Sequence, residues 1–460
     1  MVRFYFLGSF SNSPHRNKIV FVLVSIIFAS LMLELSLIKI YSISVNELIS
    51  NMGITLFVGI GIVYVIGQYL LLKFVKGFTN KRRMGKELHL NLAHRSVTVG
   101  QYLLTAILAF VILQMVLTSG YSVITLVAVT SISCVLSIVM LGLLSQKFFS
   151  WFKTRKEKVI LLYGLSSSML ALNAILTIVY VDLVLTELPP YISPHPALQF
   201  FPFIAPGSLT DILYSGFVVS SILSFMLTWS ATVLLLRYLS QRLGRARYWI
   251  ILSLPLAYFL IQFLPLFYNV FSLFSQSVSV FYLYTLFFTF SRPVGAILFG
   301  LAFWMIARRL RDKSSVVVDY MIISGIGLVL LFVSNQAIIF VDEPYPPFGL
   351  ASVSFMGLAS YLVLIGIYSS AISISEDSRL HSSIRNFAIK EANLLDSIGT
   401  AHMEQEIQKK VIEFTKRNQD RIAEEAGVQS SLTEDNMKSY LQQVIKEIQT
   451  ARRDNSNHHE

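Results

Sequence analysis

The chain has 460 residues, of which 54% are hydrophobic and only 14% are charged. Because soluble domains carry about 25% charged residues, this composition excludes an ordinary soluble globular protein and predicts an all-α, polytopic membrane protein. The formal net charge of +11 arises before residue 376, where 25 of the 37 Lys and Arg residues but only 11 of the 26 Asp and Glu residues lie. We therefore expect the lipid bilayer, and not a nucleic acid, to be the partner of this basic excess.

Ten apolar segments are long enough to cross a bilayer as helices. They cover residues 19–43, 52–75, 97–118, 121–146, 159–185, 209–236, 248–271, 280–307, 316–341 and 349–375. The first segment lacks the pattern of a cleaved signal peptide, so we expect it to be a retained helix. These segments predict a transmembrane domain of ten helices over residues 1–375.

Lys and Arg residues fall on one side of the predicted membrane. The connections on that side hold clusters such as residues 81–86 and 308–313, whereas the opposite connections contain Lys39 alone among the basic residues. The positive-inside rule then predicts that both termini lie in the cytoplasm. The plasma membrane of a prokaryotic cell is the simplest location to expect.

Arg292 is the most informative single residue of the predicted membrane domain. It lies near the centre of the apolar run 280–307 and is followed directly by Pro293. A charge at that depth costs several kcal/mol, so it needs a partner, a water-filled cavity or a function. One interpretation is a substrate or anion contact, or an ion pair with Glu34 at similar depth in the first segment. The alternative is a structural arginine bonded to backbone carbonyls, with Glu34 neutral or reaching Lys39.

Several amides also lie within the predicted spans. They are Asn173, Gln262, Asn269, Asn335 and Gln336. Such amides most often form hydrogen bonds between helices, although Asn173 and Gln262 join Arg292 and Glu34 as candidate substrate or ion-pair residues. Pro255, Pro265 and Pro293 are compatible with the broken helices that surround transporter sites, but no internal repeat supports that interpretation.

Two connections on the predicted outer side have recognisable sequences. Residues 118–121, Thr-Ser-Gly-Tyr, predict a tight turn and therefore an antiparallel helix pair. Residues 182–211 contain six prolines, which forbid a regular helix and favour extended pieces. Cys134 is the only cysteine, so a disulfide framework and a cysteine-based metal cluster within one chain are excluded.

Residues 376–451 are polar and have apolar residues at helical spacing, which predicts a cytoplasmic tail of amphipathic helices. Ile407, Val411 and Phe414 share one helix face. A capping box at residues 431–434 opens a further helix whose apolar face is Met437, Leu441, Val444 and Ile448. We expect this tail to bind a cytoplasmic protein or to self-associate as a coiled coil, and residues 452–460 to be disordered.

The tail sequences AIKEANLLDSIGTAHMEQEIQKKVIEF and SLTEDNMKSYLQQVIKEI resemble those of uncharacterised multi-pass membrane proteins of archaea, in particular of the ammonia-oxidising lineage. That resemblance implies a topology and no site residues, because the group has no assigned activity. The helical array also resembles the membrane sensor regions of some signalling kinases, but residues 376–460 hold no ATP-binding catalytic domain.

No nucleotide, zinc-protease or serine-hydrolase motif appears, so the sequence supports no enzyme, cofactor or metal site. The leading hypothesis is a non-enzymatic sensor or scaffold that couples ten membrane helices to a cytoplasmic tail. The alternative is a secondary transporter or channel with a site around Arg292 at the middle of the membrane.

Overall fold

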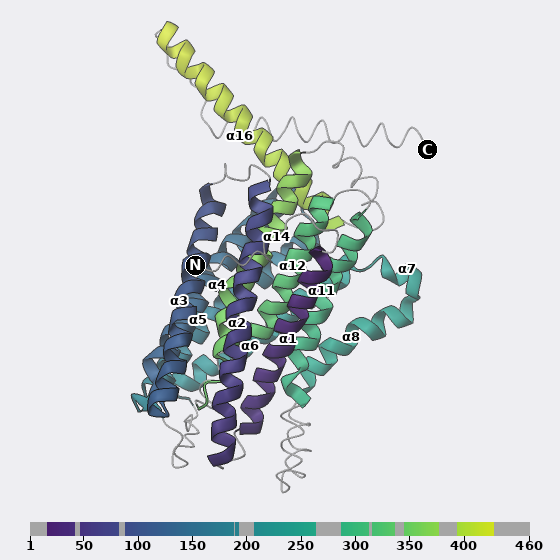
Figure 1. Ribbon diagram of the computed structural model, residues 1–460. Helices are drawn as coiled ribbons and strands as arrows, with labels where there is room; N and C mark the ends of the chain where they lie inside the picture. Colours follow the sequence, from purple (N-terminus) through teal and green to yellow (C-terminus); the bar gives the residue numbers. More distant parts are fainter. Residues whose placement is uncertain are drawn as a thin grey trace.

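The computed structural model describes residues 16–41, 47–81, 88–187, 189–192, 207–263, 287–311, 315–335, 345–376 and 393–426. This part of the chain forms twelve helices and one ribbon of two short strands (Figure 1). In chain order the elements are α1 (Arg16–Tyr41), α2 (Glu47–Lys81), α3 (Leu88–Thr118), β1 (Tyr121–Ser122), α4 (Val123–Thr154), α5 (Lys158–Thr186), β2 (Tyr191–Ile192), α6 (Leu209–Leu235), α7 (Leu239–Leu243), α8 (Arg245–Ile261), α11 (Ser291–Leu310), α12 (Ser315–Ser334), α14 (Leu350–Glu376) and α16 (Asn393–Ala426). The prediction of an all-α polytopic protein is confirmed.

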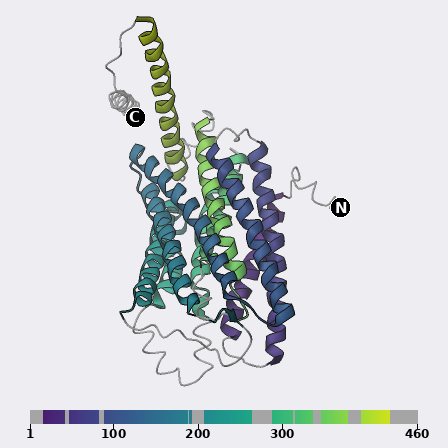
Figure 2. The ribbon, with the colours of Figure 1, turned by 90° about the vertical axis from the view of Figure 1, so that its left-hand side faces the viewer.

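Nine helices of the described part are long and apolar enough to cross a membrane, and they form one elongated array (Figures 1 and 2). Each coincides with one of the predicted segments. The seventh predicted segment, 248–271, holds α8, which has 17 residues and contains Pro255. Asn269, Pro265 and Gln336 lie outside the described residues, as do the predicted helix that starts at residue 431 and the segment 452–460.

The outward faces of the array are apolar, as expected where lipid is the solvent. On α3, for example, Val99, Val116 and Leu117 are among the most exposed large hydrophobic side chains. A protein in water rarely leaves so much apolar surface uncovered. These faces therefore contact the lipid bilayer.

The two ends of the array are different. At the ribbon end, β1 pairs with β2 in antiparallel register, with Tyr121 opposite Ile192. The predicted tight turn at residues 118–121 is confirmed there, because α3 ends at Thr118 and Ser119 takes a positive φ of 55°. At the opposite end, which we call the α16 end, α16 leaves the array (Figures 1 and 2).

The helix at the centre of the array is α14, although it follows the other described membrane helices along the chain. Every side chain from residue 350 to residue 374 is buried. Small residues make this possible, since they allow neighbouring backbones to approach. At Gly366 a Cβ atom would lie 2.7 Å from the Tyr320 carbonyl oxygen and from the Ser324 nitrogen of α12. Only glycine fits this crossing of α12 and α14.

Candidate functional site

Arg292 lies at the start of α11, as the second residue of the helix. Helical residues 287–289 precede α11, and the described apolar span runs from Phe287 to Leu310. Residues 264–286 lie outside the described part, so the central position of Arg292 in a continuous apolar helix stays a prediction. Pro293 is likewise in the first turn, where a helix tolerates proline because the missing N–H has no intrahelical partner there. Pro293 therefore does not break α11.

The Arg292 guanidinium contacts two other helices. Nη1 donates a hydrogen bond of 2.7 Å to the carbonyl oxygen of Asn335, and Nη2 donates one of 2.7 Å to Oγ of Ser221 in α6. The guanidinium carbon also lies 5.7 Å from the centre of the Phe217 ring. Because Asn335 directly follows α12, Arg292 places its positive charge at the carboxyl end of that helix, where the macrodipole favours a cation.

Asn173 extends this contact into a network that joins α5, α6 and α12. Asn335 Nδ2 donates to Oδ1 of Asn173 at 2.9 Å. Asn173 Nδ2 donates to the Phe217 carbonyl at 3.0 Å and to Ser220 Oγ at 2.8 Å. The prediction that amides bond between helices is thus confirmed for Asn173 and Asn335.

Gln262, which follows α8, joins the same neighbourhood through the residue before Arg292. Its Nε2 donates to Ser291 Oγ at 3.2 Å and to the Phe259 carbonyl of its own helix at 2.8 Å. Three of the four candidate residues are therefore brought together. We call the set the Arg292 cluster. It consists of Asn173, Ser220, Ser221, Gln262, Ser291, Arg292 and Asn335.

The Arg292 cluster lies deep within the array. Asn173 is midway along α5, and Ser220 is midway along α6. Helix α12 ends beside the first turn of α11, which helical residues 287–289 precede. Neither the structural nor the functional interpretation of Arg292 is excluded by this arrangement, since helix ends at mid-membrane also characterise transporter sites.

Glu34 of α1 is fully buried and lies at a different place. Its carboxylate accepts hydrogen bonds from the backbone N–H groups of Gly349, Ala351 and Ser352 at 2.8, 3.2 and 2.9 Å, and from the Ser352 hydroxyl. These groups form the amino end of α14, where a helix favours an anion. The ion pair with Arg292 considered above is not formed, because each charge instead occupies the end of a helix.

Sequence reasoning missed this role of Glu34, but a signal for it was present. The first turn of α14 contains no acidic residue, and the helix is preceded by Gly349, which has no side chain to act as a cap. A buried helix end of that kind requires an acceptor from elsewhere in the chain. The candidates were the few acidic residues of the apolar segments, among which Glu34 is the one within α1.

At the α16 end, the first part of α16 is held by the ends of α4 and α14. Leu394, Leu395, Ile398 and Ala401 are buried in the same hydrophobic core as the array. At Gly399 a Cβ atom would collide with Ile374 of α14. The beginning of α16 is therefore packed against the membrane helices.

Polar contacts fix the same part of α16. Arg155 Nη2 and Glu404 Oε1 form an ion pair of 2.8 Å. Gln405 Nε2 donates to the carbonyl and the hydroxyl of Ser150 at 2.9 and 3.1 Å, and to Thr154 Oγ1 at 3.0 Å. These contacts lie at the end of α4, where the chain leaves the apolar part of the array.

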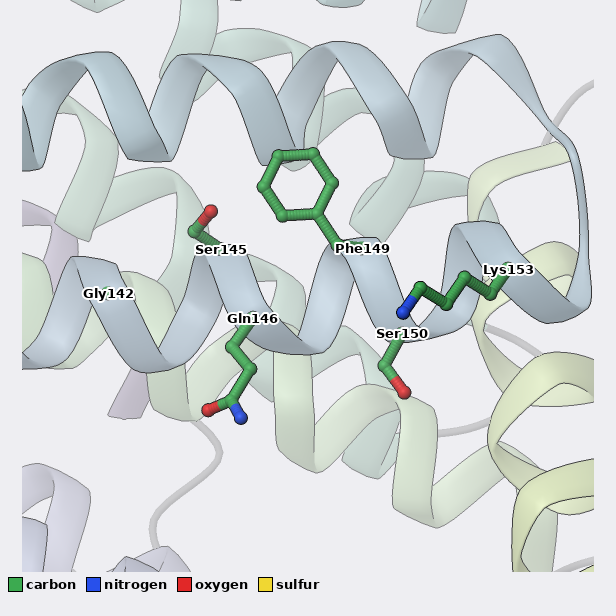
Figure 3. Close-up of a pocket in the computed structure, with 6 residues that line it drawn as sticks. All are labelled: Gly142, Ser145, Gln146, Phe149, Ser150 and Lys153. Carbon is green, nitrogen blue, oxygen red and sulfur yellow. The ribbon is translucent and has the colours of Figure 1, made fainter. Parts of the chain in front are cut away.

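A groove of about 500 Å³ runs along the nearby part of α4 (Figure 3). Its described lining is Gly142, Ser145, Gln146, Phe149, Ser150 and Lys153. Ser145 and Phe149 point to one side of α4, and Gln146 and Ser150 to the other. The Gln146 amide and the Lys153 ammonium suit an anionic group such as a lipid headgroup, whereas the Ser145 hydroxyl bonds to the Gly164 carbonyl. Apart from Lys153, no residue of this groove stands out in the sequence.

Among the described residues no group of three or more His, Cys, Asp or Glu side chains is arranged to hold a metal ion. Comparisons of the chain with protein-family models, with curated proteins and with solved structures found no match. The resemblance of the tail to archaeal membrane proteins therefore stays a prediction.

Proposed function

We propose that this multi-pass membrane protein is a non-enzymatic sensor or scaffold of the cell membrane that presents α16 to a protein partner in the cytoplasm. The observation that carries the proposal is the contrast within α16. Residues 394–405 are largely buried against α4 and α14, whereas Ile407, Val411 and Phe414 are 48%, 36% and 68% exposed. We call these three residues the α16 stripe.

The α16 stripe differs from the other exposed apolar side chains of the molecule. Those on the membrane helices face lipid, but this part of α16 extends beyond the array (Figures 1 and 2). Apolar side chains on one face of a helix in water form a binding surface for another helix or a groove. The packed beginning of α16 supports a scaffold role, because a firmly held helix presents that surface in one orientation.

A sensing role is supported by the position of α14. One end of α14 is bonded to the buried Glu34, and its other end packs against α16. A ligand or membrane change that moves α14 would therefore also move the base of α16. The same rigid connection serves a scaffold that does not sense.

Photo-crosslinking in membranes tests the proposal. A benzophenone amino acid at Phe414, on the α16 stripe, is compared with one at Lys416, which is exposed on the opposite face of the helix. We expect a discrete adduct with another polypeptide from position 414 that is several-fold stronger than from position 416. The same measurement is made on a chain that ends after residue 430. If both positions give equal adducts, or neither gives any, in both chains, recruitment through this surface is refuted.

Transport is the second candidate function, and the depth of the Arg292 cluster favours it. Two of the five N–H groups of Arg292 bond to described residues, and Asn335 Oδ1 is buried without a hydrogen-bond partner. The test is the current of wild-type proteoliposomes after a concentration jump of chloride, phosphate or acetate. A current that the Arg292→Gln variant lacks supports transport, and the absence of any wild-type current with these anions counts against an anion pathway.

A further inference from the structure

The α16 stripe needs an occupant, and the chain itself offers one. Its three apolar residues follow the alternating four- and three-residue spacing of a coiled-coil seam, and Asn418 occupies the next position on that face. The stripe is therefore about two heptads long. A seam of that length requires a partner helix of matching length and register.

A second copy of α16 does not fit this requirement. In an antiparallel pair that aligns Val411 with Phe414 of the other copy, Lys410 would face Arg417 of that copy. In a parallel pair Lys410 would face Thr415, so neither arrangement gives it an acidic partner. Like charges that flank a short seam disfavour association.

We propose that residues 431–451 of the same chain turn back antiparallel to α16 and cover the α16 stripe. The inference concerns regulation of the surface on which the proposed function rests. The described part of α16 reaches Ala426, and the next residue in the sequence is Gly427, a residue type that often ends a helix. The four residues 427–430 then separate α16 from the capping box, and antiparallel helices are commonly joined by two to five residues.

One antiparallel register aligns the two apolar faces. It pairs Phe414 with Leu441, Val411 with Val444 and Ile407 with Ile448, because these positions mirror one another about residues 427 and 428. Asn418 falls opposite Met437. In that register the apolar face predicted for residues 431–451 matches the α16 stripe layer by layer.

Charge supports the same register. Lys410 borders the α16 stripe and would lie beside Glu447, since both occupy the position that flanks the seam on the same side. The partner helix therefore supplies the acidic residue that a second copy of α16 lacks. A protein that binds the α16 stripe would have to displace residues 431–451 or bind both helices together.

Disulfide crosslinking of the full chain in membranes tests the proposal. Val411→Cys is combined with Val444→Cys, and the control pair combines Lys409→Cys, on the opposite face of α16, with Val444→Cys. The native Cys134 is buried and stays in place. After oxidation we expect linked tryptic peptides within the monomer, with a yield several-fold above that of the control pair.

Three results would overturn the proposal: equal yields from the two pairs, no link between positions 411 and 444, or a link that joins two chains only. The pair Ile407→Cys with Ile448→Cys repeats the test if the first pair does not elute as a single peak in detergent. Lys410→Glu should slow the reaction roughly twofold, because exposed ion pairs are weak, and Glu447→Lys in the same chain should restore it.

These outcomes are separate from the test of recruitment. If no link forms between residues 411 and 444 but the benzophenone at Phe414 still gives adducts, recruitment stands and the returning helix is wrong. If the link forms, truncation after residue 430 should raise the yield of adducts several-fold, because it uncovers the stripe. If the link forms but the truncated chain gives no adducts, the returning helix is supported and recruitment through the α16 stripe is refuted.

Discussion

Carboxylates hold the start of α14 and the first part of α16 in opposite ways. Inside the array, Glu34 is fully buried and its partners are backbone N–H groups and one hydroxyl. At the α16 end, Glu404 pairs with Arg155, whose side chain is 39% exposed. A charge far from water is stabilised by the fixed dipoles of a helix end, whereas a charge at the edge is paired with a mobile side chain that water and salt screen. Deep contacts should therefore determine stability, and edge contacts should determine the position of α16.

The largest expected effect is that of Glu34→Ala, which leaves three N–H groups at the start of α14 without an acceptor. We expect the free energy of unfolding to fall by about 3–5 kcal/mol, as for other broken buried charge contacts. Thermal unfolding of the detergent-solubilised protein, followed by size exclusion, measures it. Glu413→Ala removes an exposed carboxylate of α16 and is the control. If both variants lower the free energy of unfolding equally, the deep contact does not stabilise the protein more than an exposed one.

Arg292→Lys and Arg292→Gln test the second deep charge. Lysine keeps the positive charge at the end of α12 but lacks the two-pronged guanidinium that reaches both Asn335 and Ser221. We therefore expect the free energy of unfolding to fall by about 1–2 kcal/mol. Glutamine removes the charge as well and should cost about 2–3 kcal/mol. The same unfolding assay gives both values. A neutral effect of glutamine would show that the α12 end does not need a cation.

Gly366→Ala tests how closely α14 packs between its two ends. The new methyl group would lie against backbone atoms of α12, and overpacking of this kind costs about 1–3 kcal/mol. Gly59→Ala is a matched control in α2, because its Cβ would meet no atom within 4 Å. Alanine favours a helix, so the control should be neutral or stabilising. Equal destabilisation of both variants would contradict the close approach of α12 and α14.

The smallest effect is expected for the Arg155 and Glu404 pair. A double-mutant cycle with Arg155→Ala and Glu404→Ala should give a coupling of about 0.5–1 kcal/mol, which falls as salt is added. Hydrogen exchange of residues 394–405 is the appropriate measurement, because the pair holds α16 and not the array. A coupling energy that does not fall with added salt would show that this pair, like Glu34, is shielded from solvent.

The membrane helices of the array were predictable because each of them corresponds to a continuous apolar segment that is long enough to cross a bilayer. The partners of the polar residues were not, because they depend on which helices are neighbours. Arg292 and Asn173 were recognisable as unusual residues, yet their link through Asn335 joins three separate helices. The contact between Glu34 and Gly349 connects residues 315 positions apart. The central place of α14 was equally hidden, since a helix of small apolar residues has the same sequence signature whether its neighbours are lipids or other helices.

The buried position of α14 has a consequence for the synthesis of the protein. The ribosome makes α1 with its Glu34 first, and it makes α14 after every membrane helix of the described part that packs around it. Until α14 has been translated, those helices lack the central helix against which they pack, and the Glu34 carboxyl has no helix end to bind. The final packing of the earlier helices must therefore follow the synthesis of α14. Nascent chains arrested shortly before residue 349 should be the ones most readily captured by membrane proteases and insertion chaperones.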